Sequence, residues 1–232
     1  MDTAILLAAG EGSRLRPAAP YKPLCPVGGR PLIEHALAGL AAAGMRRAIV
    51  VLGFGAEAIE THLARESWPV TVETVRSVDY KQPNGVSVLA AEAAVAGEEA
   101  LLAMCDHLVE PALYRRLAET GASGAARLGI DRDIASDLVD LDDVTCVMRD
   151  GDRIVAIGKG LADYNCFDTG VFAIGPALFE ALRGLEAPSL TEGMRVLAAQ
   201  DRAFVADCTG LRWIDVDDQT ALDKAELWLE RA

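Results

Sequence analysis

The fold is decided by a stretch near the start of the chain, which reads Ala4-Ile5-Leu6-Leu7-Ala8-Ala9-Gly10-Glu11-Gly12-Ser13-Arg14-Leu15 and is followed by Lys22-Pro23-Leu24. Its apolar beginning is typical of a buried strand. The two glycines predict a loop whose backbone N–H groups can turn toward an anion. Arg14 can bind phosphate oxygens with its planar guanidinium, and Lys22 can place a point charge beside them. Together they predict a polyphosphate site at the end of the first strand.

A pair of glycines after a strand is also compatible with a simple tight turn. The stretch lacks the third glycine of the dinucleotide-binding pattern, and it lacks the Gly-Lys-Ser/Thr of a Walker loop. The full string is more specific, because the glycine loop, the arginine and Lys-Pro-Leu occur together. It favours a polyphosphate site over a simple turn.

Length and composition restrict the class of protein. The chain has 232 residues, of which 22 are basic and 35 acidic, giving a formal net charge of −13. This balance argues against binding to nucleic acid or to an anionic membrane surface. No apolar stretch is long enough for a membrane span, and no signal peptide is apparent. The five cysteines are scattered without a Cys-x-x-Cys pair, which is typical of reduced thiols in a cytoplasmic protein.

Apolar runs predict an α/β fold in which strands and helices alternate. We expect a single domain over residues 1–232, with a nucleotide-binding part at about 1–120 and an acceptor-binding part at about 121–232. The alternation predicts a Rossmann-like, doubly wound, mixed but mostly parallel sheet. The expected strands are 48–52, 70–75 and 100–104, and the expected helices are 31–44, 56–65, 86–95 and a last one from about 219. A β-hairpin is expected over 144–157.

Two aspartates follow predicted strands far apart in the sequence. Asp106 comes directly after the strand at 100–104, and Asp215 follows the short apolar pair Trp213-Ile214. In such sheets ligands bind beyond the carboxyl ends of the strands. Two carboxylates beside a triphosphate are suited to Mg²⁺, although each aspartate alone could equally cap a helix or lie in solvent. His107 would then be placed to orient Asp106.

The first stretch resembles the signature of the sugar-nucleotidyltransferase-like superfamily, which is Leu-Ala-Ala-Gly-x-Gly-(Thr/Ser)-Arg-Leu followed by Lys-Pro-Leu. Ser13 stands in the Thr/Ser position. The resemblance implies a GT-A-like nucleotidyltransferase architecture, with residues 7–13 binding the nucleotide and with Arg14 and Lys22 as catalytic residues. It also implies that Asp106 and Asp215 bind Mg²⁺, since the Trp-x-Asp spacing favours Asp215 over Asp217.

A second stretch, Lys81 to Leu89, contains the turn signal Pro83-Asn84-Gly85. From the residues alone it predicts only a loop before a helix. In the superfamily the nucleobase rests on this turn, which implies that the base is contacted by Gln82, Asn84, Gly85 and Ser87.

The later motifs are similar to those of the CTP:inositol-1-phosphate cytidylyltransferases. They include Ile157-Gly158-Lys159-Gly160-Leu161 and Asp168-Thr169-Gly170. The resemblance implies synthesis of CDP-inositol and pyrophosphate from CTP and inositol 1-phosphate. It assigns Lys159 to the acceptor phosphate, and Asp168 with Thr169 to the acceptor hydroxyls. One position departs, because Cys146 stands where the relatives carry a basic residue.

Three questions stay open at this point. The acceptor could be phosphocholine, another phosphoalcohol, a phosphonate or a sugar 1-phosphate, and UTP could replace CTP. A homodimer is compatible with the sequence. A non-catalytic nucleotide-sensing subunit is the alternative from another class. Such a protein is expected to have lost the loop arginine, the lysine or a metal-binding aspartate, and this chain keeps all of them.

Overall fold

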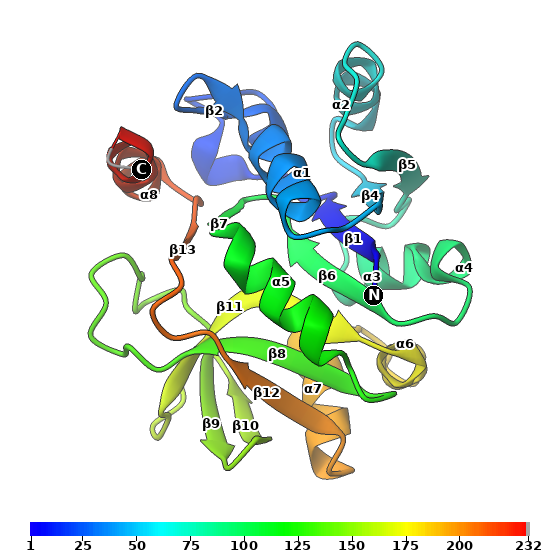
Figure 1. Cartoon of the computed structure of the whole chain (residues 1–232), viewed down its shortest axis with the longest axis vertical. Coiled ribbons are helices and arrows are strands. Elements are labelled where there is room, and N and C mark those ends of the chain that lie inside the picture. The colour runs from blue at the N-terminus through cyan, green and yellow to red at the C-terminus, as the bar shows by residue number, and fades with distance from the viewer. Residues whose placement is uncertain (231–232) are drawn as a thin grey trace.

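A nine-stranded sheet runs through the molecule, in the order β5-β4-β1-β6-β11-β8-β12-β10-β9 (Figure 1). The computed structural model describes residues 1–230. Two short two-stranded ribbons, β2-β3 and β7-β13, accompany the main sheet. The main strands are β1 (Thr3–Ala8), β4 (Arg47–Leu52), β5 (Thr71–Arg76), β6 (Ala100–Met104), β8 (Ala126–Asp131), β9 (Cys146–Asp150), β10 (Arg153–Gly158), β11 (Cys166–Ile174) and β12 (Ala203–Asp207). The ribbons comprise β2 (Pro26–Val27), β3 (Arg30–Pro31), β7 (His107–Val109) and β13 (Trp213–Asp215).

The sheet changes character at β11. Strands β5, β4, β1 and β6 are parallel, as predicted. Strand β11 is antiparallel to both β6 and β8, and β10 is antiparallel to β12 and β9. Strand β9 also pairs with β11, so that five strands close into a ring. The β-hairpin predicted over 144–157 is confirmed by β9 and β10, because strands joined by a tight hairpin must be antiparallel. The prediction that the mixed sheet is mostly parallel is wrong for its second half, where β8 and β12 are the only parallel pair among the described strands.

Helices cover both faces of the sheet, which confirms the doubly wound prediction. Alternate side chains of β1 point to opposite faces. Leu6 belongs to a core that contains residues of α1 (Leu32–Ala42), α2 (Ala56–Leu63) and α5 (Pro111–Thr120). Ile5 belongs to the opposite core, which contains residues of α3 (Gly85–Ala90), α4 (Glu92–Val95), α6 (Pro176–Arg183) and α7 (Leu190–Ala199). The helix predicted over 86–95 is thus interrupted at Ala91, and the last helix is α8 (Gln219–Glu230).

Distant parts of the chain meet at the ribbon formed by β7 and β13. Asp215 stands opposite His107 in this antiparallel pair, and the Val216 amide donates to the Asp106 carbonyl at 3.0 Å. In Figure 1 the ribbon lies beyond the end of β6, between α5 and α8. The pairing therefore brings together two aspartates that are 109 positions apart in the sequence, Asp106 after β6 and Asp215 at the end of β13.

The cysteines and the helices agree with the expectations from composition. All five cysteines are buried and free of disulfide bonds. Within residues 1–230, none of the helices combines the length and the apolar composition needed to cross a bilayer.

Thr169 lies in β11 and is fully buried. Its hydroxyl donates a hydrogen bond to the Gly129 carbonyl of β8 at 2.8 Å. Thr169→Val keeps the shape of the side chain but leaves that carbonyl without its donor. We expect a loss of about 1–3 kcal/mol in the free energy of unfolding, measured by urea denaturation. Thr120→Val is the matched control, because Thr120 also donates to a carbonyl but is exposed on α5. An equal effect of both substitutions would contradict the prediction.

Candidate active site

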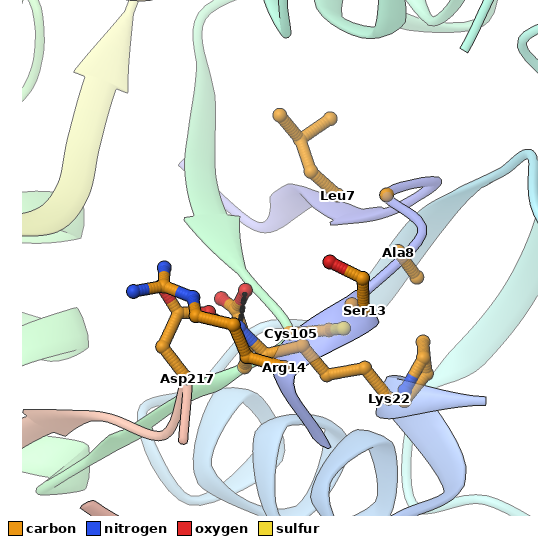
Figure 2. A pocket seen from close by; sticks show the side chains of 11 residues that line it. Leu7, Ala8, Ser13, Arg14, Lys22, Cys105 and Asp217 are labelled. Atoms are coloured by element: carbon orange, nitrogen blue, oxygen red, sulfur yellow. Dashed lines mark hydrogen bonds and ion pairs between the residues drawn. The ribbon is translucent and has the colours of Figure 1, made fainter. Parts of the chain in front are cut away.

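Two adjoining cavities open at the carboxyl ends of β1 and β6. The first, of about 280 Å³, is lined by the glycine loop and is shown in Figure 2. The second, of about 740 Å³, extends over β11, β13 and the start of α8. Arg14, Asp106 and Asp217 line both of them. The two cavities therefore form one continuous site, with the predicted phosphate-binding loop at one end.

The glycine loop is shaped by its contact with Lys22. Gly12 has a φ of +55°, and a Cβ at this position would collide with the Cβ of Lys22. Glycine therefore allows the loop and the lysine to approach closely. Of the residues predicted to bind the nucleotide here, five line the first cavity: Leu7, Ala8, Gly10, Gly12 and Ser13. Ala9 instead packs in the core, and Glu11 forms an ion pair with Arg16.

Lys22 is buried in the middle of the acidic residues of the site, with 6% of its surface exposed. Its ammonium lies 2.7 Å from Asp106 and 3.8 Å from Asp215, and it also forms an ion pair with Asp217. Burial acts to lower the pKa of Lys22, but the three carboxylates outweigh it and raise the pKa above its usual range. The lysine therefore stays positively charged.

Asp106 and Asp215 face each other beside His107, and their potential ligand atoms all lie within 4.8 Å of one another. His107 Nδ1 is 3.0 Å from Asp106 Oδ1 and 3.7 Å from Asp215 Oδ1. Burial acts to raise the pKa of Asp106, but Lys22 and the His107 hydrogen bond lower it well below its usual range. Burial raises the pKa of Asp215.

A buried side-chain oxygen of Asp215 is relevant to metal binding. Asp215 Oδ1 is buried, and in the described part of the chain it has no hydrogen-bond partner. A buried acceptor without a partner is costly, and a bound cation would satisfy it. Mg²⁺ prefers oxygen ligands and is commonly held by one or two carboxylates together with substrate phosphates. The residues present therefore fit a divalent cation. Asp217 pairs with Lys22 through one carboxylate oxygen and with Arg14 through the other.

His107 is held in place by its neighbours. Its ring stacks on Trp213, with ring centroids 6.3 Å apart and planes inclined by 13°. Gly170 has a φ of +74°, and the place of its missing Cβ lies 2.5 Å from the His107 ring. The Trp213 indole donates to the buried Asp131 at 3.0 Å. Burial lowers the pKa of His107, but Asp215 and Asp106 raise it to about 9. His107 therefore donates to Asp106 and fixes its orientation.

The residues predicted to contact the base are dispersed. Asn84 lines the second cavity, and its Oδ1 accepts from the Leu190 amide at 2.9 Å. Gln82 is exposed and belongs to neither cavity within residues 1–230. Ser87 is buried and hydrogen-bonds to Ser77 at 3.3 Å. The Gly85 amide donates to Pro188, so this turn is fastened to the start of α7.

The predicted acceptor residues separate into two groups. Lys159 and Asp168 line the second cavity, whereas the Thr169 hydroxyl is turned into the core. Burial raises the pKa of Asp168 to about 6, although the Gly170 amide donates to it at 2.7 Å. Cys146 is buried in the core, so the position that departs from the relatives lies away from the lining of the cavity among the described residues.

The structure adds residues that the sequence patterns did not single out. Asp143 lies between Arg14 and Lys159, and Lys224 of α8 lines the second cavity. Asp143 ends the acidic run Asp140-Leu141-Asp142-Asp143, which is typical of a solvated loop. Nothing in that run distinguishes Asp143 from its neighbours. The folded chain alone brings it to the cations.

Comparison with known proteins agrees with this geometry. The chain is 34% identical over 228 residues to the "Bifunctional IPC transferase and DIPP synthase" of Rubrobacter xylanophilus, a match that covers 96% of this chain and 51% of the relative. It is 31% identical over 244 residues to the "CMP-5'-(3-aminopropyl)phosphonate synthase" of Streptomyces rubellomurinus, covering 93% of this chain and 37% of that protein. The chain thus spans about half of the length of the first relative and less than half of the second.

A solved structure and a family description complete the comparison. The structure of the inositol-1-phosphate CTP transferase from T. maritima superposes with a TM-score of 0.89 at 26% identity, covering 99% of this chain and 96% of that one. The family described as "MobA-like NTP transferase domain" matches residues 4–203. The predicted nucleotidyltransferase relationship is confirmed, and the chain belongs to the family of MobA-like NTP transferase domains.

Proposed function

We propose that this protein transfers the cytidylyl group of CTP to inositol 1-phosphate, releasing pyrophosphate and CDP-inositol. The observation that carries the proposal is the continuity of the site. One space joins the glycine loop, the carboxylate pair Asp106 and Asp215, and the pocket that contains Lys159 and Asp168. The names of the relatives from R. xylanophilus and T. maritima support the choice of nucleotide and acceptor.

The proposed reaction needs no general base from the protein. A phosphate monoester has a second pKa of about 6, so its oxygen is already anionic near neutral pH. This oxygen attacks the α-phosphorus of CTP, the new P–O bond forms, and the bond to the pyrophosphate oxygen breaks. The work of the protein is then positioning and neutralisation of charge. A site without a catalytic dyad is adequate for this chemistry.

Arg14 and Lys22 interact with different phosphates in this proposal. Arg14 is half exposed at the mouth of the loop and binds the β- and γ-phosphates of the leaving group. Lys22, which packs against the loop at Gly12, stabilises charge at the α-phosphate. Asp106 and Asp215 would hold Mg²⁺, with His107 orienting Asp106. When bound, the metal ion supplies a positive charge that neutralises the phosphates.

The second cavity provides the acceptor pocket. Lys159 is assigned to the acceptor phosphate and Asp168 to the acceptor hydroxyls. A carboxylate can accept hydrogen bonds from two neighbouring hydroxyls, which suits a polyol. A phosphonate acceptor is the alternative, because the relative from S. rubellomurinus is named as a phosphonate synthase.

The metal assignment makes the first prediction of this proposal. Asp106→Asn and Asp215→Asn should each lower the rate of pyrophosphate release by about 10²-fold or more, since each removes a charged ligand. Binding of Mn²⁺, followed by electron paramagnetic resonance, should weaken in parallel. Asp163→Asn, at an exposed position, is the control for the same chemical change. Normal Mn²⁺ affinity in the Asp215 variant would exclude this residue as a ligand.

The acceptor assignment is tested by kcat/KM for a matrix of acceptors and nucleotides. With CTP, inositol 1-phosphate should exceed phosphocholine by a factor on the order of 10⁴, because a site that binds hydroxyls rejects an acceptor lacking them. Asp168→Ala should reduce this preference, and Lys159→Ala should weaken all phosphate acceptors alike. A preference of the unaltered protein for phosphocholine or a phosphonate would contradict the inositol assignment and leave the nucleotidyltransferase assignment intact.

The buried carboxyl of Asp168 predicts a dependence of stability on pH. Its folded-state pKa of about 6 exceeds the unfolded value of about 3.9. As the pH rises, the unfolded chain therefore loses the Asp168 proton before the folded protein does. The contribution of Asp168 to the free energy of unfolding falls as the pH rises from about 4 through about 6. Asp168→Asn replaces the carboxyl with a neutral amide and so removes the cost of burying a charged carboxylate. In metal-free protein it should stabilise the fold at pH 8 by on the order of 1–3 kcal/mol, and the gain should vanish near pH 4. Urea denaturation at both pH values measures it, and a gain independent of pH would refute it.

A further inference from the structure

The segment from Arg132 to Thr145 joins β8 to β9 and lies along the second cavity, and Figure 1 shows it as the long green loop beside α8. A turn near its end is fixed by local hydrogen bonds. The Asp143 and Val144 amides donate to the Asp140 carbonyl at 3.2 and 2.9 Å, and the Asp142 amide donates to the Asp140 side chain at 3.0 Å. This turn determines where the side chain of Asp143 points.

Asp143 bridges two cations that come from separate parts of the fold. Its Oδ2 lies 2.7 Å from Arg14, and its Oδ1 forms an ion pair with Lys159. Arg14 belongs to the glycine loop, whereas Lys159 directly follows β10. An anion between a guanidinium and an ammonium is the arrangement in which proteins bind a phosphate group. The carboxylate of Asp143 thus stands where a phosphate would be expected.

We propose that Asp143 is an internal competitor for substrate phosphate: its carboxylate occupies a phosphate-binding position between Arg14 and Lys159, and a substrate phosphate displaces it. The competing group is a phosphate of the nucleotide or the phosphate of the acceptor. Because one carboxylate reaches both cations, this position lies at the boundary between the nucleotide and acceptor parts of the site.

The exposure of these pairs makes the displacement feasible. The side chains of Arg14 and Lys159 are 52% and 59% exposed, and that of Asp143 is 29% exposed. Exposed ion pairs contribute little to stability, so breaking both costs little. A phosphate dianion brings more charge and more oxygens to the same two cations. The tethered carboxylate nevertheless lowers the apparent affinity, because only the fraction of molecules with free cations can bind.

The test is the affinity of Asp143→Asn for phosphate compounds, measured by isothermal titration calorimetry at constant Mg²⁺. The probes are inorganic pyrophosphate, CTP and inositol 1-phosphate. Asp143→Asn removes two exposed ion pairs that compete with the probe, so its Kd should be about three- to tenfold lower than that of the unaltered protein. This gain in affinity should decrease at high salt. Asp142→Asn is the matched control. It removes the same charge from the same turn, and within residues 1–230 Asp142 forms no ion pair and lines neither cavity.

A second comparison separates competition from a general change in charge. In a Lys159→Met background, Asp143→Asn should tighten inositol 1-phosphate binding less than it does in the unaltered protein, since one of the contested cations is gone. Tightening for CTP alone identifies a nucleotide phosphate as the displacing group, and tightening for inositol 1-phosphate alone identifies the acceptor phosphate.

Unchanged or weakened binding of all three probes in Asp143→Asn would overturn the proposal, because Asp143 would then organise the two cations rather than compete for them. Equal tightening by Asp142→Asn would overturn it as well. The choice of CTP and inositol 1-phosphate rests on the proposed function, whereas the pyrophosphate result does not. Tighter pyrophosphate binding without turnover of inositol 1-phosphate would therefore reject the acceptor and leave the competition intact.

Discussion

The buried ammonium of Lys22 is the interaction on which the site depends. It contacts carboxylates from the end of β6 and from the segment after β13, and it packs against the glycine loop at Gly12. A buried charge is tolerated only when it is paired, and pairing here requires that all three segments meet. The arrangement of loop, carboxylates and lysine is therefore mutually dependent, and loss of one member would leave the others with unbalanced buried charge.

This arrangement explains how a chain of net charge −13 can bind polyanions. Three cations of the site are paired with acidic side chains: Lys22 with Asp106 and Asp217, and Arg14 and Lys159 with Asp143. The pairs differ in burial. Lys22 is enclosed, so its charge is fixed within the fold, whereas Arg14 and Lys159 are exposed and can exchange partners at small cost. A phosphate can therefore compete with Asp143 more easily than with Asp106.

The elements with strong local patterns were predictable. The first strand, the helix after Pro31 and the alternation up to β6 follow from buried apolar runs and regular spacing. The hairpin of β9 and β10 was also predictable from its turn. The direction of β11 was not, because an apolar strand has the same sequence pattern whether its neighbour is parallel or antiparallel. Strand β11 pairs with β6, β8 and β9, and these partners are set by packing over the whole domain. The single helix expected over 86–95 is likewise broken at Ala91, a residue with no helix-breaking character.

The candidate site also contains features that could be predicted from the sequence and features that could not. Local patterns were enough to predict the glycine loop with Arg14 and Lys22 and the position of Asp106 and Asp215 at strand ends, because these motifs depend on local backbone geometry and fixed spacing. The fold was needed to show that Thr169 turns into the core while Asp168 faces the cavity. Adjacent residues of a strand point to opposite sides, and packing selects which side is buried. The tertiary structure also decided that Asp143, one of several similar acids in a polar loop, meets Arg14 and Lys159. Arg14 and Asp143 are 129 positions apart in the sequence, and no local pattern encodes their contact.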